Sequence, residues 1–426
     1  MASQHSASTV LSIRSDFRQG QFRRQLKSEL YRNGSRNSFQ NVYRIPHFQH
    51  RYPKAQLNPL TSEYTDIAND WLVSFGVDKE LGPSLWTSFV AAKTPELMGY
   101  VFSNDVEPRD FLWLCKFVAF IFAFDTMMDE SDWADAVELS SDMILEMNLL
   151  LLWNDPENKR LLERLNSILD RLMATEASRE RLQNHTFHAD LVHARKKSKS
   201  LLDVKMGAFA SALRDLWLEY IEAVPAEFAS REAELLLDYL SACLWEQKNR
   251  KTREEITIPD FITLRRSAAC VLPFVVCTDL IIEHKRQKYA ISHLPNSIFY
   301  GNNMQNLLAA SADCVAWHND AFSFEKEIYR DGDLHNLVEI VSRQYNCHSH
   351  TQAGELVVEL LHDRIAEMEL AYKNLKSEAS PEFHPAIDRY MKTCRDWIPG
   401  THEFHITTLR YKNSNSLSEI EENLKM

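Results

Sequence analysis

An apolar stretch that ends in carboxylates constrains the fold of this chain more than any other feature. Eight almost wholly apolar residues, four of them Phe, begin at Phe117 and lead directly into Asp125 and Asp129. Apolar residues continue upstream to Pro108, and proline is favoured in the first turn of a helix. The pattern predicts one helix over about residues 108–128, hydrophobic nearly all round and therefore buried.

The two aspartates at the end of this helix need a positive partner. Asp125 and Asp129 are four residues apart, so their carboxylates share one face, about 6 Å apart along the axis. Like charges at the end of a buried helix repel each other and are costly to desolvate. A hard divalent cation such as Mg²⁺ suits carboxylate oxygens. The alternative is the solvated end of a core helix, which this segment alone does not exclude.

Composition favours an all-α protein. The chain has only 10 glycines in 426 residues, against an average of about 7%, and runs of alternating β-branched residues are few. Helical patterns follow one another without a linker, which predicts one large domain over residues 58–412. A flexible basic extension (1–57) would precede it, and a polar tail (413–426) would follow.

Charge and cysteine usage narrow the function classes. Residues 1–55 hold ten Lys or Arg against two acidic residues, a net of +8, while the whole chain carries −12. The body is therefore acidic, which argues against nucleic-acid binding. The basic start is also typical of an organelle transit peptide, although we favour a flexible extension. No apolar run reaches the roughly 18 residues of a transmembrane helix, and no secretory signal is present. Seven cysteines without a CxxC pair indicate reduced thiols in a cytoplasmic protein.

Apolar residues at three- and four-residue spacing predict further helices. A loop is predicted at 286–302, and a chain break at Pro399-Gly400 before a short element at 402–411. The predicted helices start near 61 and 258 and cover 84–103 (as two), 133–153, 157–174, 178–223, 230–250, 303–330, 335–345, 351–377 and 383–396.

A second oxygen-rich motif lies on the long helix predicted over 303–330. Asn319, Ser323 and Glu327 are spaced i, i+4, i+8, so their side chains form a gently curving stripe. An amide oxygen, a hydroxyl and a carboxylate could seat one Mg²⁺, and Lys326 beside them could contact an anion. The alternative is a polar stripe on a solvated face, but aromatic residues crowd the same turns.

With both motifs in this order, the chain resembles the class I terpene synthases, the terpenoid cyclases of microbes, and among them the fungal type. The resemblance covers roughly residues 60–412. Its elements are an aspartate-rich motif at Asp125, the Asn/Ser/Glu motif over Asn319–Glu327, and the pair Arg410-Tyr411.

Through the resemblance, two positions before the second motif correspond to positions of the family pattern. Thr126 departs from the family's usual double aspartate, which leaves open whether Asp129 or Glu130 assists Asp125. The family's diphosphate-sensing arginine matches Arg265 best, with Arg266 possible.

Two further positions depart from the family pattern. Ala269 stands where the family has a helix break that helps to ionise the substrate, often at a glycine. Phe404 replaces a tryptophan that bacterial members tend to carry before the Arg-Tyr pair.

The resemblance implies a single class I terpenoid synthase domain, an α-helical barrel or bundle with a central apolar pocket and both metal motifs at its mouth. An allylic diphosphate would be held by three Mg²⁺, two on the Asp125 side and one on the Asn/Ser/Glu motif. Loss of diphosphate would leave an allyl cation that the pocket must shield from water. Hydrogen bonds to the diphosphate are expected from Arg265, Lys326, Arg410 and Tyr411.

Aromatic faces can stabilise such a cation by about 0.5–2 kcal/mol per contact. Each candidate alone is more often an ordinary core residue. Phe122 and Phe404 are the ones we assign to substrate binding, among the candidates Phe117, Phe120, Ile121, Phe122, Phe404 and Trp317.

The function implied is a lyase that cyclises farnesyl diphosphate to a sesquiterpene hydrocarbon or alcohol, acting as a monomer or homodimer. A diterpene cyclase using geranylgeranyl diphosphate and a non-catalytic helical protein that retains the scaffold remain alternatives. The sequence lacks the second aspartate-rich motif of chain-elongating prenyltransferases and the Asp-x-Asp-Asp motif of protonation-initiated cyclases. It also lacks GxSxG, HExxH and a phosphate-cradling glycine loop.

Overall fold

The computed structural model describes most of the chain as helices. The described residues are 43–102, 106–130, 206–252, 255–289, 292–330 and 332–411, with 147, 150, 151, 160 and 163. No strand occurs among them, which confirms the all-α fold class. Apart from these five residues, the predicted helices at 133–153 and 157–174 lie outside the described residues, as do residues 178–205 of the helix predicted over 178–223 and the tail at 413–426.

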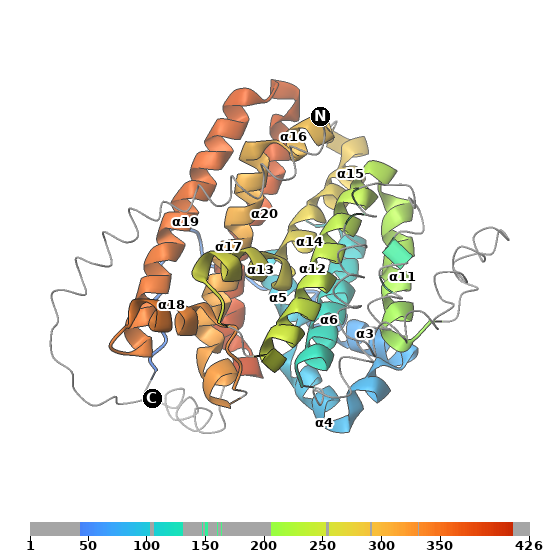
Figure 1. Ribbon diagram of the computed structural model, residues 1–426. Coiled ribbons are helices and arrows are strands. Elements are labelled where there is room, and N and C mark those ends of the chain that lie inside the picture. Colours follow the sequence, from blue (N-terminus) through green and yellow to red (C-terminus); the bar gives the residue numbers. More distant parts are fainter. Residues whose placement is uncertain are drawn as a thin grey trace, which may run out of the picture.

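Figure 1 shows how the helices are arranged, and their buried hydrophobic residues form one continuous core. All seven cysteines are buried free thiols, as expected. The described elements are α3 (Thr61–Phe75), α4 (Val77–Ala92), α5 (Pro95–Val101), α6 (Pro108–Glu130), α11 (Ala208–Ala223), α12 (Ala226–Thr252), α13 (Ile258–Ala268), α14 (Val271–Val276), α15 (Thr278–Tyr289), α16 (Asn296–Phe299), α17 (Asn302–Phe324), the π-helix η2 (Glu325–Arg330), α18 (Leu337–Tyr345), α19 (His350–Glu378), η3 (Pro381–Phe383), α20 (His384–Thr407) and η4 (Leu409–Tyr411).

The two helices that carry the sequence motifs are both held from several sides. The aspartate helix α6 packs against α3, α4, α5 and α11. Helix α17 packs most extensively against α19 and also contacts α20, α13, α14 and α18. Each motif lies on a helix that packs against several others, so its backbone is held in place without a ligand.

The length and composition of helix α6 would suffice for a membrane span, although Lys116 and Asp125 interrupt its apolar residues. Of the apolar window in Pro108–Asp129, 72% is buried inside the protein. A bent pair, Ile258–Ala268 with Val271–Glu283, passes the same test only if the two parts count as one span. The packing of α6 in the core accounts for its apolar character.

The predicted break at Pro399-Gly400 is wrong, because α20 continues through both residues to Thr407. The reason is a close helix crossing. A Cβ atom at Gly400 would lie 2.8 Å from Val101 Cγ2 and 3.1 Å from the Val101 backbone nitrogen. Gly400 therefore lets α20 approach α5 closely, and packing outweighs the hydrogen bond that Pro399 cannot donate.

Two other predicted boundaries also differ. The predicted loop at 286–302 contains the end of α15 and the short helix α16. The predicted helix at 303–330 is α-helical only to Phe324 and then becomes the π-helix η2, which carries Lys326 and Glu327. Such a widening of the turn is frequent at functional sites.

Residues 43–57 lie packed along the bundle, although we expected them to belong to a flexible extension. We call this segment the N-terminal strap. The Tyr43 hydroxyl donates a hydrogen bond to the Ala321 carbonyl of α17 at 2.7 Å and is buried. Phe48 is 6% exposed, and its ring stacks on His362 with centroids 5.7 Å apart. The strap therefore supports the outer side of the second motif's helix.

Replacing Phe48 with alanine should destabilise the protein by about 3 kcal/mol, because a buried aromatic ring is lost and a cavity remains. The matched control is Ile45→Ala in the same strap, where the side chain is 49% exposed and the expected change is within about 0.5 kcal/mol. Urea unfolding of both variants measures the difference. Equal stabilities would contradict a packed strap.

Candidate active site

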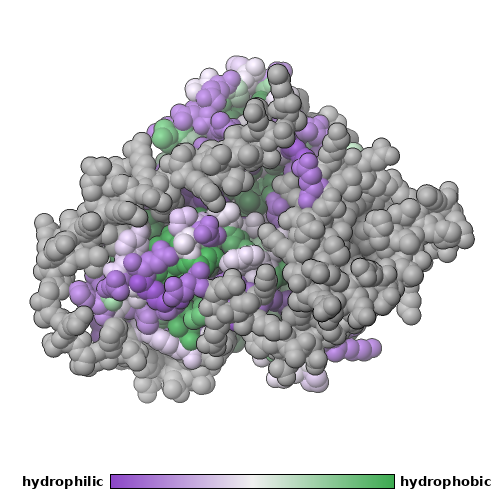
Figure 2. All heavy atoms as spheres, in the orientation of Figure 1, coloured by the Kyte–Doolittle hydropathy of each residue, from purple (hydrophilic) through white to green (hydrophobic). Residues whose placement is uncertain are grey.

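One cavity of about 980 Å³ joins the two motifs. Its walls come from α4, α6, α12, the α13–α14 break, α17, η2, α20 and η4. On the face shown in Figure 2, hydrophobic atoms are visible in a hollow beside a cluster of hydrophilic side chains. Oxygen-bearing and basic groups line one part, and the apolar walls include Phe89, Ile121, Phe122, Phe274 and Trp397.

The α6 carboxylates are each paired with an arginine from a distant part of the chain. Arg410 donates from Nη2 to Asp125 Oδ2 at 2.8 Å, and its guanidinium lies 5.0 Å from the Phe122 ring centroid. Arg250 Nη1 lies 2.5 Å from Asp129 Oδ1. Two guanidinium groups therefore supply positive charge beside the aspartates of α6.

The carboxyl group of Asp125 has a raised pKa. Burial and the nearby Asp129 carboxylate raise the pKa of Asp125 to about 6, although the positive charge of Arg410 opposes the shift. About a third of the side chain, 36%, stays open to the cavity. A carboxylate that is costly to ionise and faces a cavity favours the arrival of a further cation.

Sequence reasoning missed the group around Arg250. This arginine on α12 contacts Asp129, Glu246 at 3.7 Å and Asp333 at 2.9 Å. His335 Nδ1 in turn lies 2.9 Å from Asp333 Oδ1. The sequence signal that could have revealed this group is the i, i+4 spacing of Glu246 and Arg250 near the end of a long helix. The group ties the end of α6 to the segment after η2.

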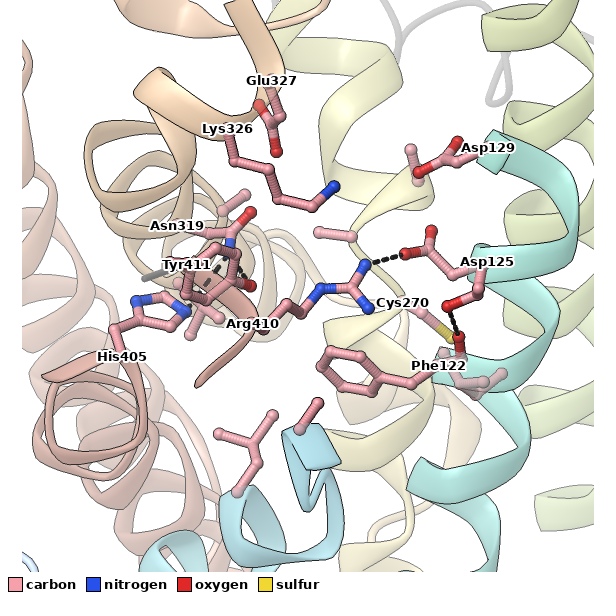
Figure 3. Close-up of a pocket in the computed structure, with 18 of the residues that line it drawn as sticks. Phe122, Asp125, Asp129, Cys270, Asn319, Lys326, Glu327, His405, Arg410 and Tyr411 are labelled. Atoms are coloured by element: carbon pink, nitrogen blue, oxygen red, sulfur yellow. Dashed lines mark hydrogen bonds and ion pairs between the residues drawn. The ribbon is translucent and has the colours of Figure 1, made fainter. Parts of the chain in front are cut away.

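The opposite wall presents Asn319 with both ends of its amide engaged. Arg265 Nη2 donates to Asn319 Oδ1 at 2.8 Å, and Asn319 Nδ2 donates to the Tyr411 hydroxyl at 2.8 Å. Arg265 also donates from Nε to Asp320 Oδ1 at 2.9 Å. Two of the residues expected to bond the diphosphate, Arg265 and Tyr411, thus contact an expected metal ligand. Figure 3 shows Asn319 and Lys326 across the cavity from Asp125.

The other two members of the second motif differ in exposure. Glu327 lines the cavity, and its Oε2 accepts a hydrogen bond from Asn336 Nδ2 at 2.9 Å. Ser323 does not line the cavity, because its side chain is fully buried. Its Oγ has no hydrogen-bond partner in the described part of the chain. A buried hydroxyl without a partner is costly, so coordination of a cation by this oxygen would be favourable.

The donor set fits a hard divalent cation. Carboxylate and amide oxygens from α6, α17 and η2 line the cavity, and the buried Ser323 hydroxyl lies on the same helix as Asn319. Such oxygens are the ligands that Mg²⁺ takes. Among the described residues, no cluster of three or more His, Cys, Asp or Glu side chains could hold a metal by itself. A cation here would therefore depend on Asn319 and Ser323, and on an anionic ligand that completes the shell.

The structure distinguishes the two candidate sensor arginines. Arg265 lines the cavity, whereas Arg266 forms two hydrogen bonds to Asp313, at 2.6 and 2.7 Å. Just beyond them, α13 ends and Ala269 is its cap. Cys270 then adopts a left-handed φ of 52°, and the segments on its two sides, Ile258–Ala268 and Val271–Glu283, meet at a bend of 50°. The helix break therefore lies where Ala269 was expected to mark it.

Of the aromatic and apolar candidates, Ile121 and Phe122 line the cavity. Phe404 does not: it is fully buried, and its ring stands edge-on to Phe122 with centroids 6.1 Å apart. It supports a wall residue instead of forming the wall. Phe117, Phe120 and Trp317 are likewise buried core residues outside the lining. The unexpected aromatic lining residues are Phe89, Tyr239, Phe274 and Trp397.

The all-α fold and the cavity that joins the two motifs agree with the class of cyclase that the sequence resembles, and comparisons with known proteins support that class. Residues 165–367 match the family model described as "Terpene synthase family 2, C-terminal metal binding". The chain is 60% identical to "Alpha-gurjunene synthase" of Marchantia polymorpha over 99% of this chain and 97% of that protein. The chain belongs to the terpene synthase family, and it is a terpene cyclase.

More distant similarities extend the same result. The chain is 25% identical to "4-epi-cubebol synthase ((2E,6E)-farnesyl diphosphate cyclizing)" of Streptosporangium roseum, over 51% of this chain and 58% of that protein. Germacradien-4-ol synthase of Streptomyces citricolor has the same fold, with a TM-score of 0.61 at 17% identity over 86% of this chain and 100% of that one.

Proposed function

We propose that the chain catalyses the Mg²⁺-dependent ionisation and cyclisation of farnesyl diphosphate to a sesquiterpene hydrocarbon or alcohol, with release of diphosphate. The observation that carries the proposal is the composition of one cavity. Oxygen donors and cations from distant elements line one part of it, and aromatic rings line the rest. A relative whose name states that it cyclises farnesyl diphosphate supports the choice of substrate.

Three Mg²⁺ ions would be held by the two motifs. Asp125, with Asp129, would hold two of them, and the third would bind to Asn319, Ser323 and Glu327. Bound Mg²⁺ would supply Lewis acidity, which stabilises the negative charge of the leaving diphosphate.

The chain's own cations would orient the diphosphate. Arg265 and Lys326 line the cavity beside the second motif, and Arg410 reaches it from η4. Each can donate charge-assisted hydrogen bonds to phosphate oxygens, and Tyr411 can donate through its hydroxyl. When the allylic C–O bond breaks, its electron pair stays on the diphosphate oxygen, so these donors stabilise the charge where it develops.

The apolar walls would handle the allyl cation that remains. Phe122, Phe274 and Trp397 offer ring faces that attract a cation without attacking it. The cavity must also exclude water, since a nucleophile would quench the cation before it cyclises.

Incubation of the purified protein with Mg²⁺ and each of the C10, C15 and C20 prenyl diphosphates tests the proposal by gas chromatography. We expect a C15 product from farnesyl diphosphate. Turnover of geranylgeranyl diphosphate alone would establish the diterpene alternative. No product from any substrate would reject the proposal, and unchanged thermal stability with Mg²⁺ plus pyrophosphate would then favour a non-catalytic protein.

Ser323→Ala should separate metal binding from folding. The variant removes a buried hydroxyl that lacks a partner, so the metal-free protein should unfold at the same temperature or slightly higher. Stabilisation by Mg²⁺ plus pyrophosphate should weaken, with about tenfold more Mg²⁺ needed for half the effect. Differential scanning fluorimetry measures both quantities. An unchanged Mg²⁺ requirement would remove Ser323 from the ligand set.

The effect of Mg²⁺ plus pyrophosphate on stability should grow between about pH 5.5 and 7.5. The pKa of Asp125 is raised to about 6 by burial, and metal binds the ionised form, so protons compete with it at the lower pH. Metal-free stability from this group runs the other way: a raised carboxyl pKa favours the protonated folded state and loses that contribution as pH rises through about 6. Melting curves across this range test both signs, and Asp125→Asn should flatten both trends.

A further inference from the structure

Three histidine rings form a line of hydrogen bonds that ends on the amide of Asn319. His405 Nε2 lies 3.2 Å from Asn319 Nδ2, and His405 Nδ1 lies 2.9 Å from His318 Nδ1. His318 Nε2 then lies 3.1 Å from His402 Nδ1. The line starts at His405 of α20, which lines the cavity, crosses to His318 of α17 and returns to His402 of α20, and the last two rings do not line the cavity.

The direction of every hydrogen bond in this line is set at the end where His405 meets Asn319. The guanidinium of Arg265 can only donate, so the oxygen of the Asn319 amide must face it and the nitrogen must face His405. An amide nitrogen can only donate, so His405 Nε2 must accept. A neutral His405 ring therefore carries its proton on Nδ1.

The same reasoning fixes the next two rings. His405 Nδ1–H donates to His318 Nδ1, so the proton of His318 lies on Nε2. That Nε2–H donates to His402 Nδ1, which leaves the other nitrogen of His402 as the position for its proton. Each ring therefore has one compatible tautomer, and no bond in the line can reverse alone.

The middle of the line is closed to solvent. His318 is 3% exposed and His405 is 6% exposed. The ring of His318 lies between Phe322, 4.5 Å away, and Phe48 of the N-terminal strap, 5.0 Å away, measured between centroids. Water cannot readily replace a lost partner here, so the loss of one ring leaves buried polar atoms unpaired.

We propose that His405, His318 and His402 form a positioning relay that acts together with Arg265 to hold the Asn319 amide with its oxygen toward the metal side of the cavity. The proposal rests on the metal role assigned to Asn319 above. An amide can turn over at little steric cost because its oxygen and nitrogen are nearly the same size. A turned amide would present a donor to the metal and also to Arg265, so the acceptor at His405 Nε2 adds to Arg265 in keeping the oxygen on the metal side.

The tautomers can be measured without metal or substrate. In protein carrying ¹⁵N-labelled histidine, nitrogen shifts and long-range couplings should show the Nδ1–H tautomer for His405 and the Nε2–H tautomer for His318. The opposite tautomer at either ring in the metal-free protein would overturn the proposal, whatever the enzyme's activity.

Three variants test the effect on the metal. His318→Leu should need about tenfold more Mg²⁺ for half-maximal thermal stabilisation in the presence of pyrophosphate, as loss of a partner behind a metal ligand typically does. His318→Asn keeps an acceptor oxygen near the Nδ1 position and should stay close to the wild-type requirement. The matched control is His362→Leu, since His362 also packs on Phe48 but bonds to the Gln49 carbonyl instead of the relay.

The outcomes separate this inference from the proposed function. If the wild type itself gains no stability from Mg²⁺ plus pyrophosphate, the proposed function fails and the tautomers alone decide the relay. If the wild type responds and folded His318→Leu responds at the same Mg²⁺ concentration, the relay does not position Asn319. Should His318→Leu not fold, His405→Gln replaces it, because its oxygen can still accept from Asn319 while the bond to His318 is lost.

Discussion

Asp125→Asn should lower the turnover of farnesyl diphosphate by about a thousandfold, the loss expected when a main stabiliser of transition-state charge is removed. An amide keeps the shape of the side chain but removes the negative charge that attracts the cation. The fold should survive, because burial makes the ionised carboxylate costly and raises the pKa of Asp125 to about 6. We expect an unchanged or slightly higher melting temperature without metal.

The matched control is Asp215→Asn, which makes the same chemical change on α11, where Asp215 is exposed and accepts a hydrogen bond from Trp71. Single-turnover and steady-state assays with radiolabelled substrate measure both variants. More than about a tenth of wild-type turnover in Asp125→Asn would contradict its assignment as the principal ligand of the aspartate motif.

Glu327→Gln should lower turnover by about a hundredfold or more, through the weakened binding of the metal on the second motif. The glutamine oxygen can still accept the hydrogen bond that Asn336 donates to Glu327 in the wild type, so local structure should be retained. Much of the loss should be recovered at high Mg²⁺ concentration, since the neutral side chain remains a weak oxygen ligand.

Glu355→Gln on α19, where Glu355 is exposed, is the control for Glu327→Gln. Circular dichroism and melting temperature should match the wild type in both. A folded Glu327→Gln variant with normal turnover and a normal Mg²⁺ requirement would show that η2 carries no metal ligand.

The sequence predicted the helices more reliably than their ends. The predicted end of α6 lies only two residues before the observed one. The prediction was close because a proline marks the start of this helix and carboxylates mark its end. The break at Pro399-Gly400 was wrong because the contact of Gly400 with Val101 on α5 is a tertiary feature. The strap was missed for the same reason: its extended backbone has no periodic pattern, and its order comes from contacts with α17 and α19.

The candidate site was predicted where its residues form motifs. Local spacing brought out the α6 aspartates and the stripe on α17, and the structure brings both to one cavity. Arg250 and His405 could not be found in this way, because each acts through a partner far away in sequence. Phe404 was misjudged because an aromatic residue one layer behind a wall has the same sequence pattern as one in the wall.

The most direct test of the account is a crystal structure of the protein with Mn²⁺ and pyrophosphate, read through the anomalous signal of the metal. We expect manganese peaks beside Asp125 and beside Asn319 and Glu327, with pyrophosphate between them in the same cavity. Metal and pyrophosphate bound elsewhere, or peaks on neither motif under conditions that support turnover, would contradict the claim that α6 and α17 jointly hold the diphosphate.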